Sequence, residues 1–213
     1  MDDNHLPYTA WQELGVASID DNLLGKLLAC YSEPHRKYHT LDHLKECFAQ
    51  LKTFRSTAEH PAEIELALWF HDAIYKTTRK DNEEKCARWA KECALSNGLA
   101  SDVADRIHDL VMVTKHTIAP RSQDEKLIAD IDLGILGAPP ERFALYEQQV
   151  NAEYWWVPGL LYRIMRRNVL MTFLSRKKIY HTDEFQCLCE TQARENIQHS
   201  LSHIWVNMKR SAI

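Results

Sequence analysis

Apolar residues recur at spacings of three and four through most of this 213-residue chain, and only six glycines and seven prolines interrupt the pattern. This spacing places apolar side chains on one face of a helix, whereas a half-buried strand would require strict alternation. The sequence therefore predicts an all-α fold. Because 45% of the residues are hydrophobic, the chain can bury a sizeable core, and we expect one domain over residues 1–213.

Residues that start or stop helices set the expected boundaries. The Glu33-Pro34 pair ends the first long helix, because the residue before a proline disfavours the helical region, and Asn97-Gly98 is typical of a helix C-terminus. We expect helices over residues 20–32, 40–53, 64–71, 83–95, 101–116, 124–134, 141–155, 160–175 and 183–208.

The charge pattern limits the classes of partner. The formal net charge is −4, so there is no general basic field for a nucleic acid polymer or an anionic membrane. No apolar run approaches the roughly 18–20 residues that a membrane helix needs. The N-terminus is acidic and polar, so we expect a cytoplasmic protein whose six cysteines are buried thiols.

Histidines and aspartates inside apolar segments indicate a metal site. His71-Asp72 directly follows Trp69-Phe70, and burying an imidazole beside a carboxylate is costly unless a cation compensates the charge. His39 and His43 are four residues apart, so on a helix they would face one object. A mixed histidine and aspartate set suits Mn²⁺, Fe²⁺, Co²⁺, Ni²⁺ or Zn²⁺.

Two further carboxylates, Asp130 and Asp132, lie in the apolar segment 128–137. Positions two apart on a helix differ by about 200° in direction, so both cannot point at one ion. One of them should be a ligand and the other a cap or a partner of a ligand. A second His-Asp pair, His108-Asp109, lies in the middle of a predicted helix, and we interpret it as structural.

The order H…HD…D of His39, His71-Asp72 and Asp132 resembles that of the HD superfamily of metal-dependent phosphohydrolases. The chain is most similar to the small bacterial and fungal branch described as predicted metal-dependent HD phosphohydrolases. The resemblance extends from residue 31 to about residue 196, and the segments that carry it are Tyr31–His43, Trp69–Tyr75, Asp81–Glu84, Asp130–Gly137, Ile179-Tyr180 and Ala193–Asn196.

The resemblance implies an HD-domain-like helical bundle, with a motif-bearing core over about 31–137 and helices over about 141–208 packed on it. It favours Asp132 over Asp130 as a ligand, and it implies a divalent ion (Mn, Fe, Co, Ni, Zn or Mg) held by four residues. These are His39, His71, Asp72 and Asp132, although the doubled histidine leaves His39 and His43 as alternatives.

The implied activity is hydrolysis of a phosphate ester or anhydride of a small, nucleotide-like molecule by a metal-activated water. Asp72 or Glu83 would take the proton, although a glutamate in the first turn of a helix more often stabilises the helix dipole. Residues expected to contact phosphate are Arg36, Lys115, His43 and His116, of which His116 is also a candidate ligand.

Further alternatives stay open at this stage. Arg36 could instead form an ion pair with Glu33, and Lys115 could be solvated. The protein could be a catalytically silent regulatory protein that binds metal or nucleotide. The sequence does not fix the oligomeric state, and a homodimer is one of the states that it allows.

Overall fold

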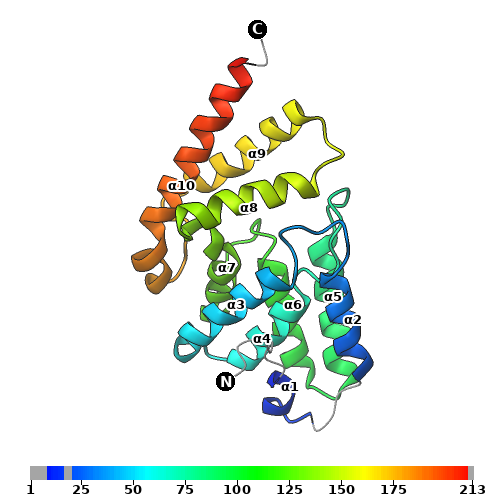
Figure 1. Ribbon diagram of the computed structural model, residues 1–213. Coiled ribbons are helices and arrows are strands. Elements are labelled where there is room, and N and C mark those ends of the chain that lie inside the picture. The colour runs from blue at the N-terminus through cyan, green and yellow to red at the C-terminus, as the bar shows by residue number, and fades with distance from the viewer. Residues whose placement is uncertain (1–8, 17–20, 211–213) are drawn as a thin grey trace. The chain divides into compact units, whose positions relative to one another are not determined.

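The computed structural model describes residues 9–16 and 21–210, and over these residues the chain is helical without a strand (Figure 1). This finding confirms the all-α prediction. The chain divides into two compact units after Asp132. The N-terminal unit contains α1 (Ala10–Glu13), α2 (Asp21–Tyr31), α3 (Leu41–Phe54), η1 (Arg55–Thr57), α4 (Pro61–Phe70), α5 (Asn82–Ser96), α6 (Ser101–Val113) and α7 (Gln123–Asp132). The C-terminal unit contains η2 (Leu133–Gly137), α8 (Pro140–Glu153), α9 (Gly159–Leu174) and α10 (Asp183–Arg210).

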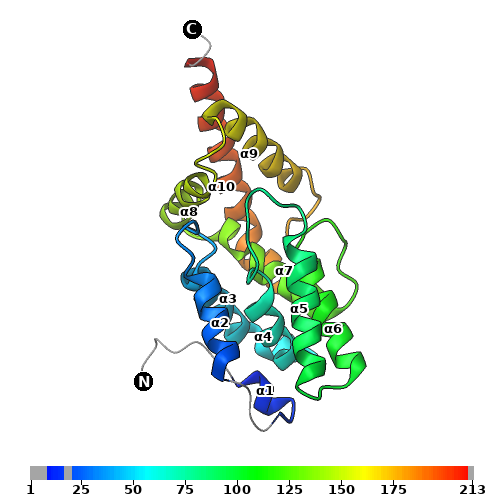
Figure 2. The ribbon, with the colours of Figure 1, turned by 90° about the vertical axis from the view of Figure 1, so that its right-hand side faces the viewer.

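Helix α4 forms the centre of the N-terminal unit. Every residue from 62 to 70 is buried, and α4 contacts α1, α3, α5, α6 and α7 (Figure 2). A helix without a polar face must be enclosed by its neighbours. Its two glutamates have dedicated partners: Arg106 on α6 donates two hydrogen bonds to Glu63 at 2.7 and 2.8 Å, and Glu65 accepts backbone N–H groups from Thr9 and Ala10.

Contacts at the two ends of α4 fix the positions of the residues that flank this helix. At the start, Pro61 occupies the first turn, and the Asp124 carboxylate from α7 accepts the backbone N–H groups of Glu59 and His60 at 2.7 and 2.9 Å. At the end, the helix stops at Phe70, and the His71 N–H still donates to the Ala67 carbonyl at 2.9 Å. His71 is therefore held at a fixed position at the end of α4.

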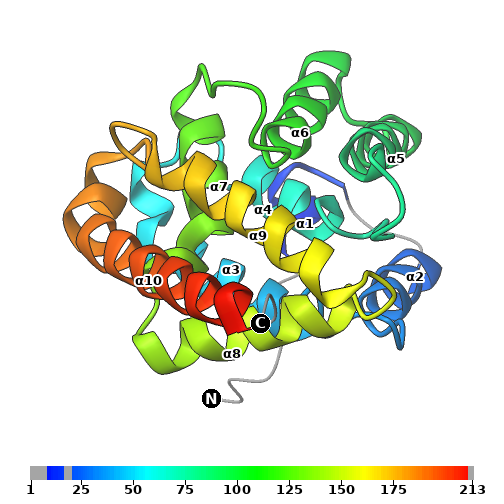
Figure 3. The same ribbon diagram turned by 90° about the horizontal axis from the view of Figure 1, so that it is seen from above.

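Helices α5 and α6 form an antiparallel pair joined by a glycine turn, and Figure 3 shows them side by side. Gly98 has φ of 84°, its N–H donates to Leu95, and the Leu99 N–H donates to Ala94. This pair of bonds satisfies the last carbonyls of α5 and requires a left-handed residue, which glycine adopts without strain. The predicted stop at Asn97-Gly98 is confirmed.

In the C-terminal unit, η2 lies against α10. Tyr180 donates a hydrogen bond from Oη to the Leu133 carbonyl at 3.1 Å, and the Asn196 side chain donates to the carbonyls of Leu136 and Ala138, each at 2.8 Å. Helix α9 contacts α10 as well (Figure 1). The motif segment 130–137 therefore ends in a short 3₁₀ helix that α10 holds in place.

Several sequence predictions need correction. Helix α1 was not predicted, and the start of the first predicted helix, residue 20, lies outside the described residues. The predicted helix 124–134 is α-helical only to Asp132, and the helix predicted to reach 116 ends at Val113. The single domain over 1–213 stays a prediction.

The expectation that all six cysteines are buried is wrong. Cys47 and Cys86 are buried, Cys187 is exposed, and the remaining three are half-buried. These cysteines lie on helices, and a helix presents a face to solvent wherever no neighbour covers it.

Among the helices that the structure describes, none combines the length and the apolar character needed to cross a membrane.

Candidate metal centre

Four donor atoms from three parts of the N-terminal unit converge. His43 lies on α3, His71 and Asp72 follow α4, and Asp132 is the last residue of α7. The Nε2 atoms of His43 and His71 are 3.3 Å apart. Asp72 Oδ2 lies 3.6 Å from His43 Nε2 and 3.1 Å from His71 Nε2, and Asp132 Oδ1 lies 3.3 and 3.6 Å from the same two nitrogens.

These separations are those of ligands around one ion. Donor atoms about 2.1 Å from a metal, at angles between octahedral and tetrahedral, lie about 3.0–3.4 Å from one another. The measured distances of 3.1–3.6 Å fall close to this range. Two imidazoles and two carboxylates also form the mixed nitrogen and oxygen set that divalent transition metals accept. The residues therefore fit a divalent cation.

The His71 ring is held in the orientation that a ligand needs. Its Nδ1 lies 2.7 Å from the Leu68 carbonyl oxygen, which accepts the Nδ1 proton. Ligating histidines ordinarily donate their second ring N–H in this way, because it fixes the ring and directs the other nitrogen at the metal. His71 is 1% exposed, so no solvent competes for this bond.

The electrostatics of the cluster favour a cation. Burial by itself lowers the pKa of His71, but the Asp72 and Asp132 carboxylates outweigh it and raise the pKa to about 9. Burial raises the pKa of Asp72, yet the nearby His71 and His39 rings hold that pKa well below its usual range. The pKa of Asp132 is also lowered, against burial, by His116 and His43. Without a metal, a proton balances the carboxylates, and a divalent cation can replace it.

His116 completes the contacts of Asp132. Its Nε2 lies 2.8 Å from Asp132 Oδ2, the oxygen that does not face His43 and His71. His116 has φ of 56°, a left-handed conformation that costs free energy in a residue other than glycine. His116 lies three residues after the end of α6, and its ring reaches Asp132. The structure thus places His116 as a partner of a candidate ligand.

His39 and His43 lie in different surroundings. Thr40 caps α3, its side chain accepting the Asp42 N–H at 3.3 Å, so the helix begins at Leu41 and His39 lies outside it. The expectation that His39 and His43 stack one turn apart on a helix is therefore wrong. The His39 ring stacks on Tyr75, with ring centroids 4.1 Å apart, and the geometry favours His43 as the donor.

Asp130 and Asp132 have different surroundings, as expected for residues two positions apart on a helix. Asp132 faces the cluster, whereas Asp130 is fully buried. The structure brings Asp132 to the other donors, in agreement with the choice that the resemblance favoured.

Arg36 is occupied by the protein itself. Its five N–H donors bond the carbonyls of His39, Asp72 and Ala73 at 2.6–3.2 Å and the Glu33 carboxylate at 2.9–3.0 Å. Its side chain is fully buried, so a guanidinium expected to contact phosphate has no donor left for it. The ion pair with Glu33, which the sequence left as an alternative, is present. Arg36 positions the backbone of Asp72.

Glu83 and Lys115 lie in a charged group near Asp72. Glu83 is in the first turn of α5; burial raises the pKa of its carboxyl, and the Asp72 charge raises it further. Lys115 forms an ion pair with Glu84 and donates to the Lys80 carbonyl at 3.4 Å. The Glu84 side chain raises the pKa of Lys115. Lys115 is therefore an ion-paired cation that stays partly exposed.

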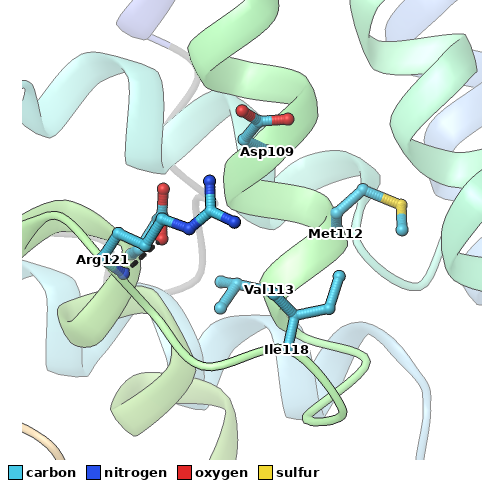
Figure 4. Close-up of a pocket in the computed structure, with 6 residues that line it drawn as sticks. Asp109, Met112, Val113, Ile118 and Arg121 are labelled. Carbon is cyan, nitrogen blue, oxygen red and sulfur yellow. Dashed lines mark hydrogen bonds between the residues drawn. The ribbon is translucent and has the colours of Figure 1, made fainter.

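The second His-Asp pair provides a natural comparison. His108 Nδ1 and Asp109 Oδ1 lie 2.9 Å apart on the outer face of α6, with side chains 35% and 67% exposed. Asp109 lines a small cavity of about 140 Å³ together with Met112, Arg121 and others (Figure 4). None of the residues lining this cavity belongs to the four-donor cluster. An HD dipeptide alone therefore does not make a site.

Cys47 also belongs to this cluster, and the sequence analysis did not predict it. Cys47 lies one turn after His43 on α3, and its Sγ is 3.7 Å from His43 Nε2. The spacing of four between His43 and Cys47 was a usable signal, because such positions share a helix face. Burial raises the pKa of the Cys47 thiol well above its usual value, and the Asp132 and Asp72 charges add to this effect.

A second group of possible ligands, Glu59, His60 and Asp124, has a structural explanation. Asp124 already accepts three hydrogen bonds there, from two backbone N–H groups and the His60 ring, and these cap α4.

Comparisons with protein-family models, with curated proteins and with solved structures found no match to this chain.

Proposed function

We propose that this chain is a divalent-metal-dependent phosphohydrolase acting on a phosphate ester or anhydride of a small, nucleotide-like molecule. The observation that carries the proposal is the convergence of His43, His71, Asp72 and Asp132: the two imidazole nitrogens lie 3.3 Å apart, and each carboxylate has an oxygen 3.1–3.6 Å from both of them. The reaction class rests on the order H…HD…D, which resembles the HD phosphohydrolases. His43 takes the place first expected for His39.

The residues have distinct roles in this proposal. A divalent cation held by the four donors supplies a Lewis acid for a phosphoryl oxygen and makes water more acidic. Leu68 fixes the His71 ring through its carbonyl, Arg36 fixes the backbone of Asp72, and His116 holds the second oxygen of Asp132. Such partners keep ligands at their working geometry.

Glu83 is the residue proposed to take the proton from water. Its raised pKa, caused by burial and then by the Asp72 charge, makes it a stronger base than an exposed glutamate. Lys115 is proposed to exchange its Glu84 partner for a phosphate oxygen, because an ion-paired lysine in a half-buried position keeps its charge and can change partners. Glu83→Gln should lower kcat by about 100-fold or more and leave metal content unchanged.

The first test is metal content. The full chain, purified without chelator, is analysed by mass spectrometry beside His71→Ala/Asp72→Ala, and we expect about one transition metal ion per chain in the parent protein and little in the variant. The matched control is His108→Ala/Asp109→Ala, which removes an exposed pair of the same composition from α6. Equal metal content in all three folded proteins would contradict the proposed site.

The second test is turnover. The metal-loaded protein is incubated with nucleotides and with simple phosphate mono- and diesters, and phosphate release is compared between the parent chain and His71→Ala/Asp72→Ala. Release that depends on the pair supports hydrolysis.

One observation favours a second candidate, a regulatory protein that binds metal or nucleotide without turnover. Arg36 has no free donor and Lys115 is ion-paired, so the charge available to a phosphate is limited. This candidate predicts tight metal or nucleotide binding with phosphate release no greater than that of the double variant.

A further inference from the structure

Cys47 lies beside the metal cluster and is enclosed by it. The side chain is on α3, one turn after His43, and is 1% exposed. Its sulfur and one donor atom each of His43, His71 and Asp132 all lie within 4.8 Å of one another. A thiol at this position is close enough for one ion to contact it together with the imidazoles and the carboxylate.

The sulfur–nitrogen separation is that of two ligands of one ion. A metal about 2.3 Å from sulfur and about 2.1 Å from nitrogen, at a tetrahedral angle, places the two atoms about 3.6 Å apart. Cys47 Sγ lies 3.7 Å from His43 Nε2 and 3.8 Å from His43 Nδ1. Because the sulfur is almost equidistant from the two ring nitrogens, the Cys47 side chain must rotate toward Nε2 to share its ion.

Cys86 provides a contrast inside the same unit. It is equally buried, but its sulfur lies 3.2 Å from the Ile74 nitrogen and 3.5 Å from the Ile74 carbonyl oxygen. The Cys86 thiol holds the loop after Asp72 and does not belong to the ligand group. Burial alone therefore does not distinguish Cys47; its place beside the donors does.

We propose that Cys47 is an additional ligand of the metal, and that its sulfur makes the site prefer thiophilic divalent ions such as Zn²⁺, Fe²⁺ and Co²⁺ over Mg²⁺ and Mn²⁺. This inference rests on the proposed metal site and deepens it. On binding, the S–H bond breaks, the proton passes to water, and the sulfur donates an electron pair to the ion, so no oxidant or reductant is needed. Thiolate is a soft ligand, and soft ligands favour these ions.

Cobalt provides the direct test, because a bound sulfur gives a near-ultraviolet charge-transfer band and any tetrahedral or five-coordinate site gives visible d–d bands. The metal-free full chain is titrated with Co²⁺ beside Cys47→Ser and Cys86→Ser. We expect both kinds of band in the parent chain and in Cys86→Ser, and d–d bands without charge transfer in Cys47→Ser.

The outcomes separate the two proposals. Visible bands without charge transfer in the parent chain would overturn the role of Cys47 and leave the metal site in place. A folded parent chain that retains no cobalt after desalting, measured by mass spectrometry, would overturn the metal site, and the role of Cys47 with it. Charge transfer that persists in Cys47→Ser but disappears in Cys86→Ser would show that Cys86 supplies the sulfur, and this too would overturn the role of Cys47.

A second measurement does not depend on a variant that folds. X-ray absorption of the zinc-loaded parent chain should show one sulfur at about 2.3 Å among nitrogen and oxygen neighbours at about 2.0–2.1 Å. A shell of nitrogen and oxygen alone would overturn the inference. In competition titrations, Cys47→Ser should lose Zn²⁺ affinity by at least about 10-fold relative to Mn²⁺.

Discussion

Gly137, the last residue of the motif segment 130–137, should be required for packing and not for chemistry. A Cβ atom built on Gly137 would lie 2.6 Å from Cys189 Cβ, 2.9 Å from the Cys189 carbonyl oxygen and 3.0 Å from Tyr180 Oη. Non-bonded carbon atoms prefer separations of about 3.5–4.0 Å. The Cys189 atoms belong to α10 and cannot rotate away, so Gly137→Ala forces η2 and α10 apart.

The cost of Gly137→Ala follows from this geometry. Overpacking by one methyl group in a close contact costs about 1–3 kcal/mol. The displacement also weakens the hydrogen bond from Tyr180 Oη to the Leu133 carbonyl, which contributes about 1 kcal/mol. The free energy of unfolding should therefore fall by about 2–4 kcal/mol. For a chain of this length that corresponds to a decrease in Tm of about 4–16 °C.

The assay is thermal and urea unfolding followed by far-ultraviolet circular dichroism. The matched control is Gly25→Ala on α2, where the residue is exposed and an added Cβ meets nothing within 4 Å. This variant should gain about 0.5–1 kcal/mol, because alanine loses less backbone entropy in a helix than glycine. If Gly137→Ala were as stable as the parent chain, or if both variants shifted in the same direction, the packing argument would be refuted.

Three further predictions concern the N-terminal unit. Arg36→Met removes five donated hydrogen bonds from buried carbonyls and a carboxylate, so urea unfolding should show a loss of about 3 kcal/mol or more; an unchanged midpoint would contradict the role of that guanidinium. The pKa of His71, about 9 against an ordinary 6.5, contributes stability to the metal-free protein that is complete below pH 6.5 and is lost as pH rises through 9. Unfolding in chelator should therefore show a decrease of about 3 kcal/mol across that interval that His71→Asn lacks, and parallel pH profiles of the two proteins would exclude this linkage. Arg106→Met leaves the buried Glu63 carboxylate without its partner and should cost about 3 kcal/mol, whereas Glu63→Met/Arg106→Met should be close to neutral by the same measurement; a double variant as unstable as the single one would show that the loss comes from packing.

Much of the fold was readable in the sequence because its signals are local. Helical periodicity, the break at Glu33-Pro34 and the glycine turn at Gly98 each act within a few residues, and each appears in the structure. Helix α1 was missed because four residues carry too little periodicity.

The candidate site was predictable only in part. The order of His71-Asp72 and Asp132 along the chain identified three of the four donors that the structure brings together. Which of His39 and His43 lies on α3 depended on where the helix begins, and Thr40 caps it one residue after His39, so that only His43 lies on α3. The sequence predicts Arg36 as a phosphate contact because the burial of its side chain depends on residues distant in the chain.

The sequence by itself determined that the chain is helical, where most helices begin and end, and which histidines and aspartates stand in apolar surroundings. Each of these properties depends on the chain within one or two helical turns. Only the tertiary structure decided which side chains meet: His43 on α3, His71 after α4, His116 after α6 and Asp132 at the end of α7, with Cys47 beside them. The physical reason is that convergence depends on how helices distant in sequence pack around α4, and a local pattern carries no record of that packing.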